Sequence, residues 1–189
     1  MLDVVLKFLK DEVNAWLSSR TGTTSTAVDL SRIIDENGKY GFAEDSVALS
    51  LIGYEEERVL RAQTPEYVYT GGQHVLMQPE LCLNLTVMFA SNHRLYDQAL
   101  KYISYILVYF QAQASFSRES HPALDERIER IVVEVQSLTY EQQNQVWAFL
   151  GGKMLPNAIY KVRMVPMRDT APTGVQPPIF GIRTEVHGR

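Results

Sequence analysis

The first residues of the chain alternate apolar and charged positions with the period of a helix. Apolar side chains recur three or four residues apart, and Lys7, Lys10 and Asp11 fall between them. The pattern predicts an amphipathic helix over residues 2–17 that packs one stripe of side chains on the rest of the protein. The stripe consists of Leu2, Val5, Leu6, Leu9, Val13, Trp16 and Leu17.

The clearest strand pattern covers residues 81–89. Leucine, valine and phenylalanine alternate there with Cys82, Asn84, Thr86 and Met88. One face of such a strand is wholly apolar and the other is mixed, which is typical of a sheet with one side on the core.

A long helix is predicted to follow, from about His93 to Ala112, with Asn92 in the N-cap position. Apolar residues again recur at helical spacing, so the helix should bury one stripe. We expect that stripe to contain Leu95, Ala99, Tyr102, Ile103, Ile106, Leu107 and Phe110.

Two weaker patterns lie between the first helix and this strand. Residues 28–34 predict a short strand, which ends before the turn-forming pair Asn37-Gly38. Residues 46–61 begin as a strand and become strongly charged halfway along. We therefore expect a hairpin arm over residues 46–79 that projects past the core, with a flexible turn between 63 and 79.

The C-terminal half predicts a strand, a helix and another strand. Residues 131–135 alternate as a strand should, and Thr139 with Gln142 has the spacing of a capping box that opens a helix. The pair Gly151-Gly152 then ends that helix.

A last strand is predicted over residues 159–167. Prolines and glycines interrupt the chain from Arg168 onward, so residues 168–189 are expected to form an extended C-terminal arm without regular structure. The order of elements favours one α+β domain over residues 1–167, with a mostly antiparallel or mixed sheet and helices on one face.

Composition fits a globular domain and excludes several classes of partner. The chain has 189 residues, of which 46% are hydrophobic, and its formal net charge is -4. This balance gives no electrostatic reason to expect nucleic acid or an anionic membrane as partner. Cys82 is the only cysteine, which excludes an intrachain disulfide and favours folding in the cytoplasm.

No group of residues predicts catalysis, a cofactor or a metal. The four histidines, at 74, 93, 121 and 187, do not fall at the spacing of a metal site. A small hydrolase or ligand-binding domain remains a minor alternative, and His93, Cys82 and His121 are its only evident starting points. We therefore expect a protein that is not an enzyme.

Other residues point to a protein partner. Ten tyrosines are many for a chain of this length, and tyrosine is enriched at interfaces, although packing at the rim of the core explains tyrosines equally well. Candidate interface residues lie in the predicted arms and at the predicted sheet edge. They are Tyr54, Glu55, Glu56, Glu57, Arg58, Tyr67, Tyr69, Tyr160, Lys161, Arg163, Met167, Ile179 and Phe180. We expect Lys161 and Arg163 of one subunit to meet carboxylates such as Glu55–Glu57 of its neighbour.

Several segments together resemble one bacterial family, long catalogued as a domain of unknown function. They are PELCLNLTVMFAS from Pro79, YDQALKYIS from Tyr96, LDERIERI from Leu124, NQVWAFLGGKMLP from Asn144 and YKVRM from Tyr160. Members of this family occur with the tail genes of extracellular contractile injection systems of the antifeeding-prophage type. The resemblance extends from the first helix to about Val165.

This resemblance implies a tail terminator of a phage-tail-like particle. Such proteins form a hexameric ring that ends the polymerisation of the inner tube and the contractile sheath and caps the particle. The implied partners are further copies of the chain and the tube and sheath proteins, and the family has no catalytic residues. The protein would assemble in the cytoplasm, into a particle that is released or anchored in a membrane. The alternative is an adaptor or baseplate-associated ring subunit of the same particle that joins the tube and sheath to another cap protein.

Overall fold

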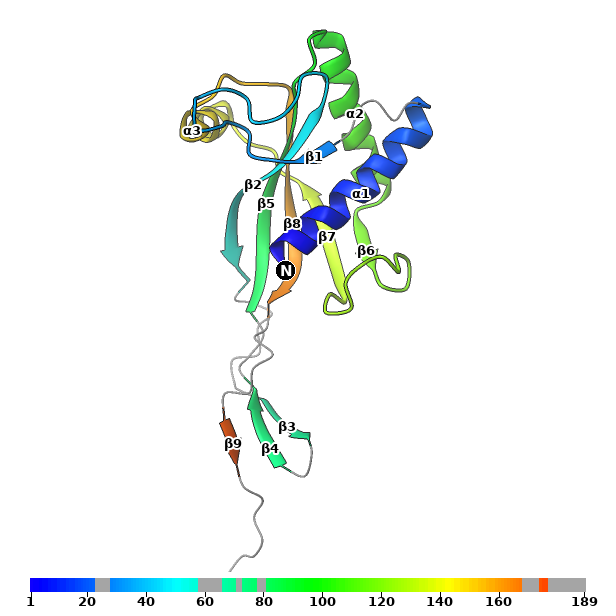
Figure 1. Cartoon of the computed structure of the whole chain (residues 1–189), viewed down its shortest axis with the longest axis vertical. Coiled ribbons are helices and arrows are strands. Elements are labelled where there is room, and N and C mark those ends of the chain that lie inside the picture. The colour runs from blue at the N-terminus through cyan, green and yellow to red at the C-terminus, as the bar shows by residue number, and fades with distance from the viewer. Residues whose placement is uncertain (23–27, 58–65, 71–72, 78–80, 168–173, 177–189) are drawn as a thin grey trace, which may run out of the picture.

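The computed structural model describes residues 1–22, 28–57, 66–70, 73–77, 81–167 and 174–176 (Figure 1). The elements follow in the order α1 (Leu2–Thr21), β1 (Val28–Leu30), β2 (Val47–Glu56), β3 (Glu66–Thr70), β4 (Gln73–Met77), β5 (Leu81–Ser91), α2 (Tyr96–Ala112), β6 (Ser115–Ser117), β7 (Arg130–Val135), α3 (Tyr140–Leu150), β8 (Asn157–Met167) and β9 (Gly174–Gln176).

Six strands form the main sheet, in the order β1-β2-β5-β8-β7-β6. The pair β1–β2 is parallel and every other neighbouring pair is antiparallel, so the sheet is mixed. The expected α+β class is confirmed. The central strand β5 pairs over nearly its whole length with β2 on one side and with β8 on the other.

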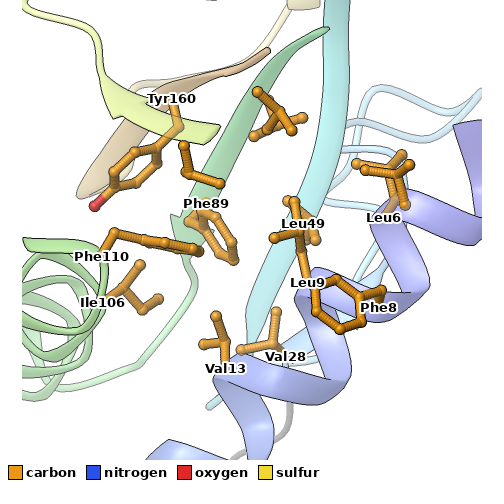
Figure 2. Close-up of a cluster of buried hydrophobic side chains, with 14 of the residues drawn as sticks. Leu6, Phe8, Leu9, Val13, Val28, Leu49, Phe89, Ile106, Phe110 and Tyr160 are labelled. Atoms are coloured by element: carbon orange, nitrogen blue, oxygen red, sulfur yellow. The ribbon is translucent and has the colours of Figure 1, made fainter. Parts of the chain in front are cut away.

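One face of the sheet carries the larger core, under α1 and α2 (Figure 2). Leu9 and Val13 of α1 lie over Phe89 of β5, and Ile106 and Phe110 of α2 join them from the side. The ring centroids of Phe89 and Phe110 are 5.7 Å apart, within the range of favourable aromatic pairs. The apolar stripes predicted for these two helices therefore meet on the apolar face predicted for β5.

The opposite face carries a second core, which the alternation had not predicted. Met88, on the mixed face of β5, is fully buried there against Trp147 of α3, together with Ile33 and Ile159. The two long helices share one face of the sheet as expected, whereas α3 lies on the other face (Figure 1). The mixed face is buried because a short helix and the 31–42 connection cover it.

Local signals at the helix ends were partly correct. Thr139 caps α3, and its capping box with Gln142 is complete, as predicted. Gly151 ends α3 with a φ of 74°. The expected start of α2 was wrong, because its N-cap is Leu95 rather than Asn92. The backbone N–H of Asn92 instead donates to Ser46 O, so residue 92 extends the pairing between β2 and β5.

Several strand predictions need correction. The strand expected over residues 28–34 stops at Leu30, and Ile34 forms only an isolated bridge with Tyr40. The short edge strand β6 was not predicted. It has only three residues, too few for alternation to distinguish it from a loop.

The predicted hairpin arm supplies two strands of a second, three-stranded sheet. Residues expected to be a flexible turn form the antiparallel pair β3–β4, and β9 pairs with β4. The C-terminal arm therefore has regular structure at Gly174–Gln176, contrary to expectation. The prolines on either side do not prevent this, since the paired residues Gly174, Val175 and Gln176 all carry an N–H. In Figure 1 this sheet lies beyond the C-terminal end of β8. None of the helices described here is both long and apolar enough to span a membrane.

We expect Leu9→Ala to lower the free energy of unfolding by about 2–5 kcal/mol, because the lost side chain leaves a cavity in the larger core. Leu9 is fully buried there. The matched control is Leu100→Ala on the exposed side of α2, which should cost less than about 0.5 kcal/mol. Urea unfolding of both variants measures the difference. Equal losses would contradict this placement of α1.

Candidate protein-interaction surfaces

Charged residues form a cluster across four neighbouring strands of the main sheet. Lys161 of β8 donates to Glu55 of β2 over the intervening strand β5. The guanidinium of Arg163 lies 3.8 Å from a carboxylate oxygen of Glu57 and 3.4 Å from one of Glu134. Side chains two residues apart on a strand share a face, so these five residues all meet on one side of the sheet. We call them the cross-strand charge cluster.

The inner end of this cluster is buried. The Glu57 carboxylate accepts a hydrogen bond of 2.9 Å from Asn84 Nδ2 of β5, and both residues are shielded from solvent. The sequence predicts that Lys161 and Arg163 meet carboxylates of a neighbouring subunit. In the structure, both cations pair within their own chain. A buried carboxylate needs a cation and hydrogen-bond donors, and the sheet register supplies them locally.

The other predicted interface residues fall in different places. Tyr54 is 67% exposed on β2. Tyr160 is only 1% exposed, and its ring packs 4.8 Å from that of Phe110, so the ring is part of the larger core. Glu56 lies at the end of β2, half-buried.

The remaining candidate interface residues either have side chains that the structure does not describe or lie outside the described residues. Tyr67 and Tyr69 are in β3 and Met167 ends β8, but the side chains of these strand positions are not described. Arg58, Ile179 and Phe180 lie outside the described residues. Their role at an interface stays a prediction.

Apolar residues on α2 and α3 form surfaces that the sequence reasoning missed. Leu95 and Leu107 were predicted to be buried, yet both are exposed. On α3 only Trp147 is fully buried, while Tyr140 and Phe149 project into solvent. A hollow of about 370 Å³ lies beside α3, lined by Ile52, Leu138, Gln142, Gln145, Val146 and Phe149. The sequence could have indicated this hollow, because α3 carries more apolar residues than are needed to bury Trp147 alone.

The three residues considered for catalysis do not meet. Cys82 is near the start of β5 and His93 lies just beyond its end, so roughly 30 Å or more of extended strand separates them. His121, in the β6–β7 connection, packs against the rings of Phe8 and Phe116. Within the described part of the chain, no three His, Cys, Asp or Glu side chains are grouped to hold a metal ion.

His93 has a structural environment. Its ring stacks on Tyr102 at 4.6 Å, and its Nδ1 shares a hydrogen bond of 2.8 Å with Ser91 Oγ. The other ring nitrogen, Nε2, is buried without a partner among the described residues. Burial lowers the pKa of His93 below its usual range, and the negative charge of Asp45 opposes this shift.

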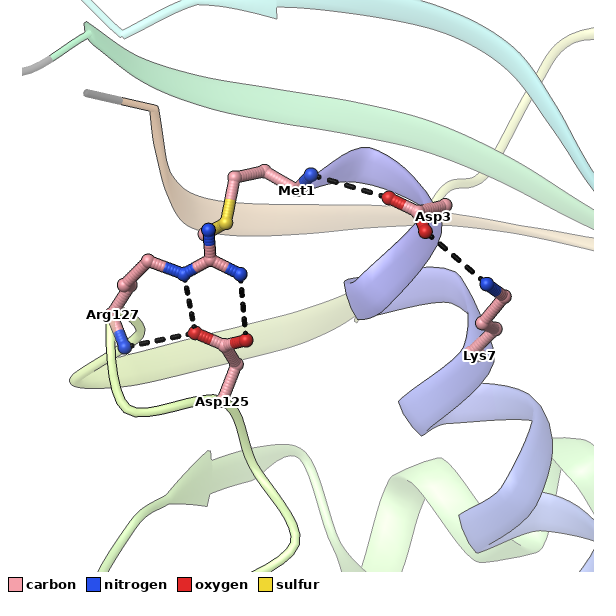
Figure 3. Close-up of polar contacts among 5 residues, drawn as sticks. All are labelled: Met1, Asp3, Lys7, Asp125 and Arg127. Atoms are coloured by element: carbon pink, nitrogen blue, oxygen red, sulfur yellow. Dashed lines mark hydrogen bonds and ion pairs between the residues drawn. The ribbon is translucent and has the colours of Figure 1, made fainter. Parts of the chain in front are cut away.

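A separate set of ion pairs lies at the start of α1 (Figure 3). Asp3 accepts hydrogen bonds from the amino terminus of Met1 and from Lys7, both at 3.2 Å. Arg127 donates to Asp125 at 2.8 Å, and this pairing holds the pKa of the Asp125 carboxyl well below its usual range. Each pair has at least one largely exposed partner, so each contributes little to stability and none defines a site.

The family of the chain can be stated from a match over almost its whole length. The family described as the Pvc16 N-terminal domain matches residues 4–180. The chain belongs to this family. No curated protein matches it.

Two solved structures share the fold of this Pvc16 N-terminal domain. One is described as the PVC sheath/tube terminator of an extracellular contractile injection system in the extended state. Its TM-score to this chain is 0.68 and the sequence identity is 14%. The match covers 100% of this chain and 64% of that one. The other is the anti-feeding prophage cap, described as a tube terminating cap, with a TM-score of 0.60 and 14% identity. The match covers 92% of this chain and 60% of that one. The chain therefore spans less than two thirds of the length of each of these two proteins. The family match confirms the family expected from the sequence.

We expect Arg163→Met to lower the free energy of unfolding by about 1–3 kcal/mol, because it removes a cation beside the buried Glu57 carboxylate. The matched control is Lys161→Met, whose partner Glu55 is exposed, and it should cost less than about 1 kcal/mol. Urea unfolding measures both. A larger loss for the lysine variant would contradict the assignment of Glu57 as the buried end of the cluster.

Stability should also fall in mild acid because of His93. Its folded-state pKa lies below the unfolded value, so the unfolded chain takes up the proton first as the pH falls through 6.5. Urea midpoints at about pH 7.5 and about pH 5.5 should differ more for the wild type than for His93→Gln. The comparison between variants removes the contribution of the other histidines. An identical pH dependence would count against a buried, neutral His93.

Proposed function

We propose that this protein is a structural subunit of a contractile injection system that ends the inner tube and sheath and caps the particle. The observation that carries the proposal is the family match over residues 4–180, together with a fold shared along the whole chain with a sheath/tube terminator. In this proposal the protein has no catalytic role, and its work is done by surfaces that bind other subunits.

The proposed assembly is a hexameric ring that stacks on the last layer of tube and sheath. A closed ring requires one patch of each subunit to meet a different patch of its neighbour. The exposed Tyr54 and the apolar surfaces of α2 and α3 are candidates for such patches. The arm residues Tyr67, Tyr69, Ile179 and Phe180 remain candidates from the sequence. The cross-strand charge cluster is given the role of fixing β2, β5 and β8 within one subunit.

The place of the ring in the particle has a second possibility. An adaptor ring would join tube and sheath to another protein that forms the actual cap, and a baseplate-associated ring would lie at the opposite end. In either case we propose that the subunits assemble in the cytoplasm with the rest of the particle.

Deletion of the gene from the producing strain tests the terminator role. A tube without its terminator continues to polymerise or stops at random, so we expect the distribution of particle lengths in electron micrographs to broaden. Expression of the wild-type chain from a plasmid should restore a narrow distribution. As a matched control, expression of Lys39→Ala, changed at one exposed position of the connection between β1 and β2, should restore it as well.

The same micrographs separate the alternatives. Particles of normal length that lack density at the distal end would favour the adaptor, and particles without a baseplate would favour the baseplate ring. Particles of unchanged length with both ends complete would contradict every version of the proposal.

A further inference from the structure

A narrow apolar groove runs between α2 and β7 at the edge of the main sheet. It has a volume of about 240 Å³, and we call it the α2–β7 groove. Its lining residues are Leu107, Phe110, Gln111, Val133, Val135 and Tyr160. A second hollow of about 120 Å³ shares Leu107 and Val135 with it and extends it past the end of β7. Leu107 is 40% exposed and Val135 is 58% exposed, so apolar side chains at its mouth face solvent.

The edge of β7 is open beside this groove. On the β8 side, Gln136 N–H donates to Ile159 O. Alternate residues of a strand direct their backbone groups to opposite edges, so Val135 directs its N–H and C=O away from β8. On that outer side β6 covers only the first half of β7, and its last contact is the bond from Val133 N–H to Ala114 O. No described group bonds the backbone of Val135.

The floor of the groove holds a polar atom without a partner. The Tyr160 hydroxyl is buried, and no described residue accepts or donates a hydrogen bond to it. Figure 2 shows this hydroxyl pointing away from Phe89. A buried hydroxyl normally has a partner, because leaving it unpaired costs free energy. An occupant of the groove could supply one.

These features together define the occupant. An open strand edge selects an extended chain, and the apolar walls select apolar side chains on alternate residues. None of the described residues that line the two hollows is charged. The fitting segment is therefore a short, uncharged and apolar stretch of extended polypeptide.

The chain carries such a segment after β9. Residues 170–182 contain no charged side chain, and the segment Ile179–Ile182 follows Pro177-Pro178. Proline has no N–H, so an added strand could begin to pair only at Ile179. Along a strand, Phe180 and Ile182 would share one face, which suits a groove on one side of the sheet.

This segment cannot reach the groove of its own chain. Four residues from Gln176 extend at most about 14 Å to Phe180. Val135 pairs with Tyr160, and the seven residues from there to the C-terminal end of β8 already span about 23 Å. The sheet that contains β9 lies farther away in the same direction (Figure 1). The segment must therefore come from another copy.

We propose that the segment Ile179–Ile182 of one subunit adds as a strand to the edge of β7 in a neighbouring subunit, with Phe180 and Ile182 in its α2–β7 groove. A ring requires two different patches on each subunit. Here one patch is the α2–β7 groove at one end of the main sheet, and the other is the segment Ile179–Ile182, which follows β9 beyond the opposite end. The inference rests on the self-association in the proposed function, but not on what the ring caps.

Disulfide cross-linking between two variants tests it. Both are full-length chains in which Cys82 is replaced by serine. One carries Val135→Cys and the other, distinguishable by mass, carries Phe180→Cys. On mixing under mild oxidation, we expect mixed dimers to form at least about tenfold faster than with Met154→Cys in place of Val135→Cys, because docking raises the local concentration of the two thiols. Met154 is equally exposed on the loop after α3 and controls for random collision.

Three results would overturn the inference. Mixed dimers no faster than the Met154→Cys control would mean that the groove is not the docking site. A chain carrying both Val135→Cys and Phe180→Cys that closes its disulfide as a monomer would show that the segment binds its own chain. If light scattering shows that the wild type assembles while the two cysteine variants cross-link no faster than the control, the inference is rejected and the proposed function stays intact. Broadened particle lengths after deletion test that function separately.

A second variant tests the role of the hydroxyl. Tyr160→Phe removes an unpaired buried group, so the urea midpoint of the free chain should not fall. If the hydroxyl bonds the added strand, cross-linking between Val135→Cys and Phe180→Cys should slow by roughly three- to tenfold in this background. Unchanged cross-linking would remove the hydroxyl from the docking site.

Discussion

The structure depends on the burial of β5 on both of its faces. Phe89 and Met88 are neighbours in sequence, yet each is fully buried in a different core, under α1 and α2 on one side and under α3 on the other. A strand buried on both faces must hold its register, because a slip of one residue would exchange the two sets of side chains. The charge cluster and the pairing with β2 and β8 reinforce that register from the edges.

The same arrangement leaves surfaces uncovered. Two helices cover one face of a six-stranded sheet and one short helix covers part of the other, so the sheet extends past its cover at β7. This is where the α2–β7 groove, the open edge at Val135 and the exposed Leu107 coincide. An α+β domain with uncovered edges suits a subunit that completes its packing against neighbours, which is the physical basis of the proposed ring.

Much of the fold could be predicted from the sequence because long elements carry strong periodicity. The stripe from Leu2 to Leu17, the alternation up to Phe89 and the capping box at Thr139 each specified their element locally. The failures are tertiary or very local. Asn92 is a good N-cap residue, but its N–H is used by the strand pairing with Ser46, so the helix begins later. Met88 is buried by α3, which periodicity within β5 cannot reveal.

The interaction surfaces were less predictable than the fold. The predicted strand placed Lys161 and Arg163 on one face, but only the register of β2, β5 and β8 showed that they pair within one chain. Tyr160 was chosen as an interface residue from its type, and the sequence did not show that its ring would be buried in the larger core. Leu107 was assigned to the core from helical spacing, because spacing identifies a face of the helix and not how far the partner sheet extends beneath it.

The most direct test of the central claim is a reconstruction of the particle end by electron cryomicroscopy. The account expects a ring of six copies of this chain on the last layer of tube and sheath, with one main sheet per subunit. A particle end that is complete without density for this chain, or the chain found only at the baseplate, would contradict the claim that it terminates the tube.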